Sequence, residues 1–324
     1  MRRSRGVLRM KIRVLGSAAG GGFPQWNCNC RNCAGLRGGT VRARARTQSS
    51  IAVRGSEAQP RGGDQEDSSW ALVNASPDIL AQLRAHPDLL PARAARDTAI
   101  SAIVLVDGQV DHTTGLYMLR ESTRAWAVWC TDAVYADLTG GNPIFEVLSH
   151  YCRIEHRPVS LDDMGFAVDG VPGVRWQALP VAGRPAPYSP NRDSPVAGDN
   201  IALVITDEHS HKTALYAPGL GAMSETVRRA MDSAACVLVD GTFWSDDEML
   251  RLGLSQKRGR DIGHLALSGP GGMLEWLGRL PDTTRRILIH INNTNPILDE
   301  DSPQRAELGR RGIEVAWDGM EIDL

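Results

Sequence analysis

The stretch Asp107-Gly-Gln-Val-Asp111-His112 directly follows an apolar run, Ala102-Ile-Val-Leu-Val106. An apolar run of this length predicts a buried strand. Carboxylate, amide and imidazole groups are costly to bury without partners, so they pack poorly but make good metal ligands. Because such groups at alternating positions would converge at the mouth of a sheet, the stretch predicts a metal site where this strand ends.

The composition of the 324-residue chain is that of an ordinary soluble globular protein, with 42% hydrophobic and 23% charged residues. The length suffices for one large α/β domain or two small ones. The net charge of −2 argues against a nucleic-acid-binding protein, which would normally carry a basic face. No apolar run is long enough to span a bilayer, so we expect no membrane partner.

The N-terminus and the cysteines predict a cytoplasmic location. The first residues are basic but lack the apolar core of a signal peptide. Six cysteines in a chain of this length do not indicate a disulfide scaffold, so we expect a reducing cytosol. Residues 1–10 are expected to form a disordered extension, and residues 11–324 a single domain.

Apolar runs predict strands throughout the chain, and capped or amphipathic segments predict helices between them. The predicted strands are residues 11–15, 49–53, 70–74, 102–106, 125–130, 174–181, 200–206, 213–217, 236–239, 286–289 and 313–316. The predicted helices are residues 76–84, 112–121, 131–138, 224–231, 246–252, 274–280 and 303–311. Strands followed by mixed strands and helices, twice over, predict an α/β fold, a four-layer αββα sandwich of two halves.

Two insertion loops interrupt this pattern. Residues 55–69 are polar and rich in Gly, Asp and Glu, which predicts an extended hairpin loop. Residues 182–199 contain several prolines and glycines around Tyr188 and Arg192, and we interpret them as a lid or substrate loop.

Three of the six cysteines lie in one short segment, Cys28-Asn-Cys30-Arg-Asn-Cys33. Thiolates at this spacing can wrap one tetrahedral ion, with sulfur–metal bonds of about 2.3 Å. Disulfides within so tight a cluster would be strained. The alternative is three free thiols in a glycine-rich loop, but we favour a structural zinc site whose fourth ligand comes from elsewhere. The other three cysteines lie in apolar surroundings and are expected in the core.

Two more predicted strands end in chemically capable residues. Asp240 and His290 each follow directly on an apolar run, and His264 lies in a loop that precedes a helix. One strand that ends in a polar residue would be weak support for a site. Three such strand ends, at Asp111 and His112, at Asp240 and at His290, predict a shared metal centre. Carboxylates and imidazoles of this kind suit iron, manganese or zinc.

The first motif is similar in spacing to the His-x-His-x-Asp-His signature of the metallo-β-lactamase superfamily, with Asp107 and Gln109 in place of the first two histidines. More specifically, the chain from Met10 onward resembles the PqqB family of pyrroloquinoline quinone (PQQ) synthesis proteins. The matching stretches are Leu15-Gly-Ser-Ala-Ala-Gly-Gly-Gly-Phe-Pro-Gln-Trp-Asn-Cys-Asn-Cys30, Asn74-Ala-Ser-Pro-Asp78, Asp107-Gly-Gln-Val-Asp-His-Thr-Thr-Gly-Leu116, Val239-Asp-Gly-Thr-Phe-Trp244, Gly263-His264 and His290-Ile-Asn-Asn-Thr-Asn-Pro296. These motifs are long and unusual, which makes the resemblance specific.

The resemblance implies a metallo-β-lactamase-like fold and a role in building PQQ, a redox cofactor made from a Glu and a Tyr of a precursor peptide. One description of the family is of a non-haem-iron enzyme that uses dioxygen to hydroxylate the tyrosine ring of a Glu–Tyr-derived intermediate. An older description is of transport of the cofactor or its precursor. The implied partners are this small-molecule substrate or PQQ itself and other PQQ-pathway proteins, and the sequence is compatible with a homodimer.

Ordinary members of the superfamily hold two metal ions and hydrolyse with a bridging hydroxide. In this chain the first ion lacks its two leading histidines, and residues 180–183 offer no histidine as the third ligand. The second ion keeps the ligands that the resemblance implies, which are Asp111, His112, Asp240 and His290. Two histidines with a carboxylate resemble the ligand set of non-haem iron(II) oxygenases, so we expect Fe(II) at this site.

Four further residues are expected to support the two metal sites. Asp107 is either a ligand or, as we favour, an acceptor for a ligand imidazole. Gln109 is expected to hydrogen-bond the substrate or a ligand. His264 either assists proton transfer, as in hydrolytic relatives, or is a structural loop residue. Asn293 stands where a phosphodiesterase relative with similar cysteine spacing has a zinc-binding histidine, so it is a candidate neighbour of the cysteine site.

Three hypotheses for the function follow. A mononuclear-iron oxygenase predicts Fe(II) dependence and oxygen uptake. A catalytically silent carrier that kept the superfamily pocket predicts tight binding of the quinone without turnover. A hydrolase with a poor dinuclear site predicts activity with zinc or manganese and no requirement for oxygen.

Overall fold

The computed structural model describes residues 9–56, 69–92 and 94–324. Most of the insertion expected at residues 55–69 and of the extension expected at residues 1–10 lies outside the described residues. One residue of that extension corrects the expectation, because Met10 is fully buried. Its carbonyl accepts a hydrogen bond of 3.0 Å from the backbone N–H of Leu324, so the packed part of the chain includes residue 10.

Within the described residues the strands form two seven-stranded sheets. The first contains, in spatial order, β14 (Glu321–Asp323), β1 (Lys11–Gly16), β2 (Ser50–Arg54), β3 (Trp70–Val73), β4 (Ile100–Val104), β5 (Trp126–Cys130) and β6 (Ile154–Pro158). The second contains β13 (Ile313–Val315), β12 (Arg285–Ile289), β11 (Cys236–Asp240), β10 (Thr213–Ala217), β9 (Ile201–Asp207), β8 (Val174–Pro180) and β7 (Phe166–Ala167).

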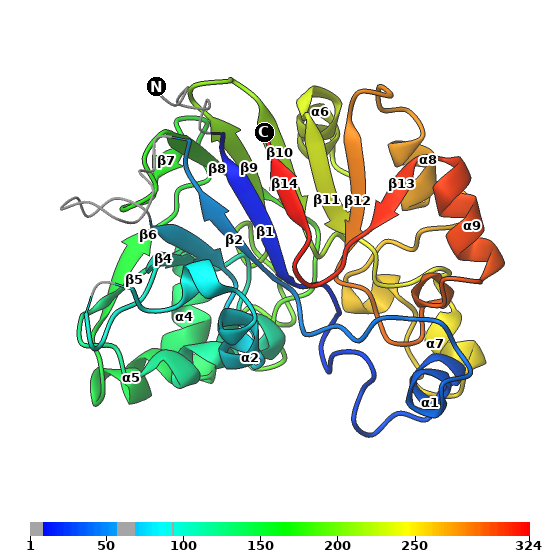
Figure 1. Cartoon of the computed structure of the whole chain (residues 1–324), viewed down its shortest axis with the longest axis horizontal. Coiled ribbons are helices and arrows are strands. Elements are labelled where there is room, and N and C mark those ends of the chain that lie inside the picture. Colours follow the sequence, from blue (N-terminus) through cyan, green and yellow to red (C-terminus); the bar gives the residue numbers. More distant parts are fainter. Residues whose placement is uncertain (1–8, 57–68, 93) are drawn as a thin grey trace, which may run out of the picture.

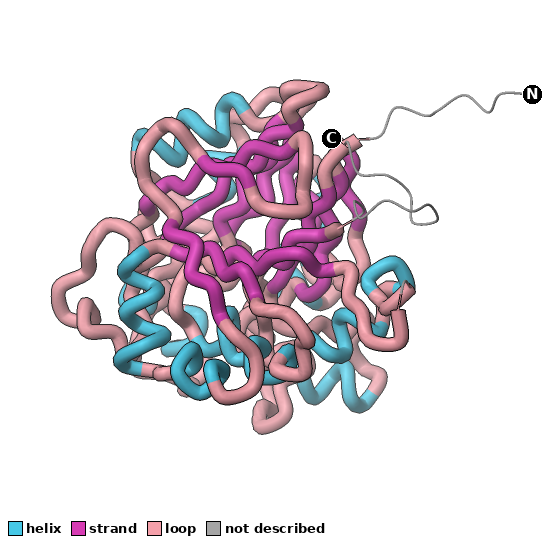
Figure 2. The backbone as a smooth tube through the Cα atoms, turned by 90° about the vertical axis from the view of Figure 1, so that its left-hand side faces the viewer, coloured by secondary structure: helices cyan, strands magenta, loops and turns pink. Residues whose placement is uncertain are grey.

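Helices cover the outer faces of both sheets (Figure 1). The α-helices are α1 (Arg31–Gly38), α2 (Ile79–Arg84), α3 (Val110–Thr113), α4 (Asp132–Ala136), α5 (Ile144–Ser149), α6 (Glu225–Ser233), α7 (Glu248–Arg251), α8 (Met273–Leu277) and α9 (Pro303–Arg310). Apolar side chains of α2, α4 and α5 pack on the first sheet, and those of α6, α8 and α9 pack on the second. The predicted four-layer αββα sandwich is confirmed, with both sheets between helical layers (Figure 2).

The apolar strands have both faces covered, which explains their nearly continuous apolar sequences. In β11, Cys236 and Leu238 belong to the core between the two sheets. The alternate residues Val237 and Val239 belong to the core under the outer helices. This alternation follows from the two-residue repeat of an extended chain.

The strands that carry the predicted ligands run parallel to their neighbours. β4 pairs in parallel with β3 and β5, and β11 pairs in parallel with β10 and β12. The carboxyl ends of parallel strands meet at one edge of a sheet, where ligand sites form in α/β folds. The fold therefore gathers the loops that follow β4, β11 and β12.

Several elements differ from the prediction. The strand expected at residues 102–106 ends at Val104. Leu105 still donates to the carbonyl of Trp129 in the first sheet, but the chain then crosses to the second sheet, where the carbonyl of Val106 accepts from the N–H of Ile201 at 2.9 Å. The helix expected at residues 112–121 is instead the short α3 followed by a 3₁₀ turn, Thr114–Leu119. The elements α1, α5, β6, β7 and β14 were not predicted.

The segment 182–199 is described throughout and contains no helix or regular strand. The hydroxyl of Tyr188 donates to the carbonyl of Gly108, which places this segment against the first motif. None of the described helices is both long and apolar enough to cross a bilayer.

Candidate metal centre

Two loops bring three of the predicted ligands together. Asp111 and His112 lie in α3, shortly after β4, and His290 directly follows β12. One ligand atom of each of these three side chains lies within 4.8 Å of the other two. Ligand atoms about 2.1 Å from one ion lie at most about 4 Å apart, so this spacing is close to that around a single metal.

Asp107 holds the ring of His112. Nδ1 of His112 lies 2.8 and 2.9 Å from the two carboxylate oxygens of Asp107. An ionised carboxylate only accepts hydrogen bonds, so Nδ1–H donates, and Nε2 offers its lone pair once a metal ion has displaced the proton from that nitrogen. Nε2 is buried, has no hydrogen-bond partner among the described residues, and lies 3.8 Å from Oδ2 of Asp111. Asp107 therefore presents an unused imidazole nitrogen to the centre, the role we favoured for it.

Thr242 holds the ring of His290. The backbone of His290 is left-handed, with φ of 59°, a conformation that non-glycine residues rarely adopt. The Thr242 hydroxyl donates to the His290 carbonyl at 2.9 Å and lies 2.9 Å from Nδ1 of the same residue. Nε2 of His290 lies 3.4 Å from Oδ2 of Asp111, so the ring is aimed at the same carboxylate as His112.

Asp240, which we expected as a metal ligand, lies in a second group of possible ligands that shares His290 with the first. Its Oδ2 lies 2.8 Å from Nδ1 of His264 and also accepts from the N–H of Leu220, while Oδ1 accepts from the N–H of Thr242. Asp240, His264 and His290 form a second group whose ligand atoms lie within 4.8 Å of one another. Asp240 is thus a neighbour of the three-residue centre, and its carboxylate is directed to His264, a residue that we expected only in a proton-transfer or structural role.

Neighbouring carboxylates raise the pKa of two imidazoles of the cluster, His112 and His264. Burial lowers the pKa of His112, but the charges of Asp107 and Asp111 outweigh it and raise this pKa to about 9. Burial raises the pKa of Asp111, but His112 and His290 hold it well below its usual range. Asp240 and His264 face each other and show the same balance. Burial alone would lower the pKa of His264 and raise that of Asp240, but the attraction between the two groups outweighs burial, so the pKa of His264 is raised and that of Asp240 is lowered. A cation is electrostatically favoured here, because a metal ion can replace these imidazole protons.

Asp107 and Gln109, which stand in place of the two leading histidines, both form hydrogen bonds within the protein. Both oxygens of Asp107 face His112, and Oδ1 also accepts from the N–H of Gln109. The Gln109 amide donates to the carbonyl of Arg184 at 2.9 Å. Gln109 also lines the pocket, and its contact with the substrate or a ligand stays a prediction. Both oxygens of Asp107 and the amide nitrogen of Gln109 thus have hydrogen-bond partners within the protein.

A pocket of about 400 Å³ opens on this centre. Its walls include Asp107, Gln109, Asp111, His112, Arg184, Arg192, Thr242, Phe243, Lys257, His264 and His290. Segment 182–199 contributes both arginines, which supports its interpretation as a substrate loop. The volume is within the range of small-molecule sites.

The cysteine cluster is also assembled. The Sγ atoms of Cys28, Cys30 and Cys33 lie within 4.8 Å of one another, and all three thiols are free. The N–H groups of Gln25 and Cys30 donate to Sγ of Cys33 and Cys28 at 3.3 and 3.4 Å. Burial raises the pKa of Cys30 to about 12, whereas hydrogen bonds from Cys30, Cys33 and Asn293 outweigh burial at Cys28 and lower its pKa.

Asn293 lies beside this cluster, as its sequence position suggested. Its amide nitrogen lies 3.3 Å from Sγ of Cys33 and 3.8 Å from Sγ of Cys30. In this arrangement the amide N–H groups of Asn293 face the sulfur atoms and can donate hydrogen bonds to them. Asn293 is therefore a neighbour of the cysteine cluster, and its role as a ligand stays a prediction.

Short contacts connect the cysteine cluster to the metal centre. The Asn32 amide donates to the carbonyls of Asn293 and Asn295 at 3.1 and 2.9 Å. The Asn295 amide in turn donates to the carbonyl of Gly241 at 2.8 Å, next to Asp240. These hydrogen bonds tie residues 290–295 to the cysteine cluster through Asn32 and to the end of β11 through Gly241.

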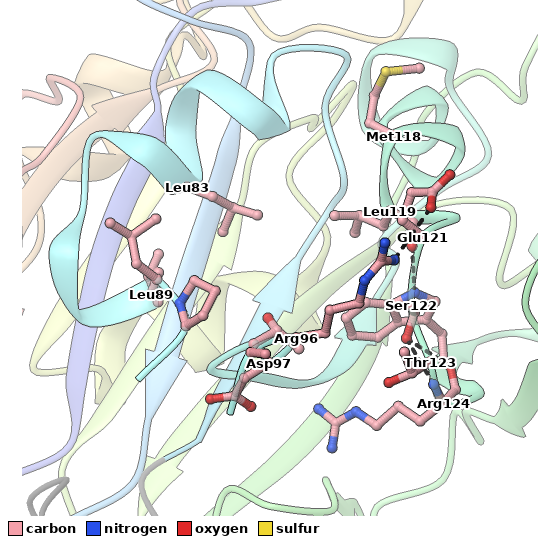
Figure 3. Close-up of a pocket in the computed structure, with 15 residues that line it drawn as sticks. Leu83, Leu89, Arg96, Asp97, Met118, Leu119, Glu121, Ser122, Thr123 and Arg124 are labelled. Atoms are coloured by element: carbon pink, nitrogen blue, oxygen red, sulfur yellow. Dashed lines mark hydrogen bonds and ion pairs between the residues drawn. The ribbon is translucent and has the colours of Figure 1, made fainter. Parts of the chain in front are cut away.

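A second cavity of about 430 Å³ lies elsewhere, between α2 and the segment before β5 (Figure 3). Its walls are largely apolar, with Leu83, Leu89 and Leu119, and its rim carries an ion pair of 3.6 Å between Arg96 and Glu121. It contains none of the predicted site residues, so the chemistry is assigned to the pocket at the metal centre.

The glycines of residues 16–22 predict a tight turn close to the site, and Gly20 does approach the centre so closely that a Cβ there would lie 3.2 Å from Oδ2 of Asp111. Sequence reasoning missed two other features of the centre. Thr242 touches both His264 and His290, and its position two residues after Asp240 was the available signal. Arg184 had no signal in the sequence, because only the folded loop brings it to the pocket.

Comparisons with known proteins agree with this architecture. A family model described as beta-lactamase superfamily domain matches residues 69–291. A coenzyme PQQ synthesis protein B of Azoarcus sp. is 63% identical over 315 residues, covering 97% of this chain and 100% of the relative. The protein of the same name from Cupriavidus necator is 58% identical over 313 residues, covering 97% and 99%.

Solved structures give the same result. Zn(2+)-bound PqqB from Methylobacterium extorquens is 34% identical and superimposes with a TM-score of 0.83, covering 97% of this chain and 100% of that chain. A diphosphatase of the PhnP family, 16% identical with a TM-score of 0.64, shares the fold alone. The chain therefore belongs to the coenzyme PQQ synthesis protein B family of the β-lactamase superfamily.

Proposed function

We propose that this chain acts in PQQ biosynthesis as an oxygenase with one iron(II), which hydroxylates the tyrosine ring of a Glu–Tyr-derived precursor. One oxygen atom of dioxygen enters the ring, the other leaves as water, and an external reductant supplies the two electrons that this step consumes. Family membership supports the pathway, since the curated relatives are named for PQQ synthesis. The name of the similar structure says that PqqB from Methylobacterium extorquens binds Zn(2+). We infer that this chain also binds metal and that iron is its working ion.

The observation that carries this proposal is the buried Nε2 of His112, which has no partner among the described residues. It is directed, with Nε2 of His290, towards Oδ2 of Asp111. Two imidazoles and one carboxylate fit a cation and match the ligand set of non-haem iron(II) oxygenases. Asp111, His112 and His290 would hold the ion, and iron(II) bound there would supply the activation of dioxygen.

The surrounding residues have assigned tasks in this proposal. Asp107 keeps the proton of His112 on Nδ1, and Thr242 orients the ring of His290. Asp240 fixes Nδ1 of His264, which leaves Nε2 of that ring to hold or accept a proton from a phenolic substrate. Zinc at Cys28, Cys30 and Cys33 is proposed to be structural.

A hydrolase is the less favoured function, because the usual two-metal mechanism needs a first ion. In this chain Asp107 faces His112 and Gln109 faces the carbonyl of Arg184. Two side chains with these partners supply no ligand set for that ion. This arrangement supports chemistry at a single metal.

The experiment is anaerobic loading of the protein with Fe(II), Zn(II) or Mn(II), followed by oxygen-electrode measurements with a Glu–Tyr-type substrate. Ascorbate is supplied in every reaction as the two-electron reductant. We expect oxygen uptake and a product heavier by one oxygen atom with Fe(II), and neither with Zn(II) or Mn(II). An Asp111→Ala/His112→Ala variant should lose the activity, and a His209→Ala variant, altered at an exposed histidine, should keep it. Turnover with zinc or manganese in the absence of oxygen would establish a hydrolase, and binding of PQQ without turnover would establish a carrier.

A further inference from the structure

Three basic side chains line the metal pocket without an acidic partner. Arg184 and Arg192 come from segment 182–199, and Lys257 comes from the loop after α7. Among the described residues, none of the three has a carboxylate within ion-pair distance. The chain as a whole carries a net charge of −2, so this concentration of cations is not the consequence of a basic protein.

Two other arginines show how a paired guanidinium differs from this set. Arg228 lies 2.7 Å from a carboxylate oxygen of Glu225, and Arg260, at the rim of the neighbouring cavity, lies 2.7 Å from Asp246. Arg192 instead has a pKa held below its usual value by burial and by the charge of Arg184. The two guanidinium groups therefore repel each other, and an anion between them would relieve that repulsion.

The two arginines are anchored in a way that leaves donors free. One nitrogen of Arg184 donates to the carbonyl of Asp261 at 2.9 Å, and one of Arg192 donates to the carbonyl of Pro185. Each guanidinium has five N–H donors in a fixed fork that matches a carboxylate. The anchors orient the forks, and the remaining donors can bind a ligand.

We propose that Arg184 and Arg192, with Lys257, form a carboxylate-binding subsite, so that the pocket takes a small substrate carrying at least two carboxylate groups. The assignment of this ligand as the reacting substrate rests on the function proposed above. The subsite lies in the same pocket as the metal centre and Phe243, so one molecule can place its carboxylates on the arginines and its ring near the metal.

The test is calorimetric titration of zinc-loaded protein with the dipeptide glutamyl-tyrosine, compared with the amidated analogue glutaminyl-tyrosinamide. Zinc keeps the metal constant and redox-silent. Arg184→Gln and Arg192→Gln should each weaken binding of the dipeptide by about tenfold, as expected for loss of a charge-assisted hydrogen bond. Binding of the amidated analogue should be unchanged. The matched control is Arg260→Gln, which removes the same charge from an arginine already paired with Asp246.

A loss of fivefold or more for the dipeptide alone supports the subsite. A smaller loss, an equal loss for both compounds, or a wild-type protein that does not prefer the dipeptide overturns it. Lys257→Gln, on a different and exposed loop, provides a second variant if the arginine variants melt at lower temperature than the wild type. The two proposals can fail independently. If the oxygenase proposal alone is wrong, the Fe(II)-loaded protein takes up no oxygen, but the dipeptide still binds in a way that depends on the arginines.

Discussion

Both carboxylate oxygens of Asp107 lie within 2.9 Å of Nδ1 of His112. This contact fixes the imidazole tautomer and directs its second nitrogen to Asp111 and His290. Asp107 occupies the position of a metal-binding histidine in the superfamily signature, but its task is to orient the histidine five residues later. In the proposed single-metal site, the replacement would remove a ligand of the first ion of an ordinary dinuclear centre and orient a ligand of the second.

Asp107→Asn is expected to weaken metal binding at the centre by about 10- to 100-fold, as for other changes to residues that orient ligands. The amide keeps the size of the side chain but lacks the charge that holds the proton on Nδ1. Competition with a chromophoric chelator measures the affinity. Asp169→Asn, which changes an exposed aspartate that makes only a 3.8 Å ion pair with Arg157, is the matched control. An unchanged affinity in Asp107→Asn would mean that the contact does not orient His112.

Gly20→Ala is expected to lower metal affinity by about tenfold without unfolding the protein. The added Cβ would lie 3.2 Å from Oδ2 of Asp111, so the carboxylate must shift by a few tenths of an ångström. The free energy of unfolding should change by less than about 1 kcal/mol. The control is Gly309→Ala, where a Cβ would meet no atom within 4 Å. Equal affinities of the two variants would contradict the placement of Asp111.

Cys33→Ser is expected to remove one equivalent of bound metal per chain and to lower stability. An ion that binds the native state alone, at a concentration a thousandfold above its Kd, contributes about 4 kcal/mol. Elemental analysis and chemical denaturation measure the two effects. Cys152→Ser, which changes a buried cysteine outside the cluster, should keep the metal content. Retention of the metal by Cys33→Ser would show that the cluster is not a zinc site.

Asp207 is expected to make the stability of the protein sensitive to acid. Burial raises the pKa of Asp207, but hydrogen bonds from Ser56, His209 and Ser210 outweigh it and hold the pKa below the ordinary value of 3.8. A carboxyl group with a lowered folded-state pKa stabilises the protein above the unfolded-state pKa, and this contribution is lost as the pH falls through the folded-state pKa.

Asp207→Asn should therefore lower the free energy of unfolding by about 1.5 to 3 kcal/mol at pH 7. The difference between the variant and the wild type should shrink as the pH falls below about 4, the ordinary pKa of a carboxyl group. Urea denaturation across this pH range measures it. A difference that is independent of pH would assign the loss to packing and not to charge.

The fold class followed from the sequence because strands covered on both faces have continuous apolar runs, such as residues 236–239. The strands β6, β7 and β14 escaped prediction for the opposite reason. All three lie at or next to the ends of their sheets, and β6 and β14 carry charged residues such as Glu155 and Glu321. Edge strands need such charges to avoid pairing with other chains, and the charges hide the apolar pattern.

At the site, the sequence indicated which residues are chemically capable but not how they pair. Asp111, His112 and His290 could be grouped because each lies close after a parallel strand. The contact between Asp240 and His264 could not, since it depends on how the loop before α8 folds back over β11. The same holds for Arg184 and Arg192, whose closeness is set by an irregular segment with no periodic pattern.

The most direct test of the account is turnover with isotopically labelled dioxygen by the Fe(II)-loaded protein, with a Glu–Tyr-type substrate and ascorbate as the two-electron reductant. Mass spectrometry of the product measures whether an oxygen atom of the gas enters the tyrosine ring. The account predicts one labelled oxygen per product, absent with the His112→Ala variant and with zinc in place of iron. A product that carries oxygen from water, or that forms without dioxygen, would contradict it.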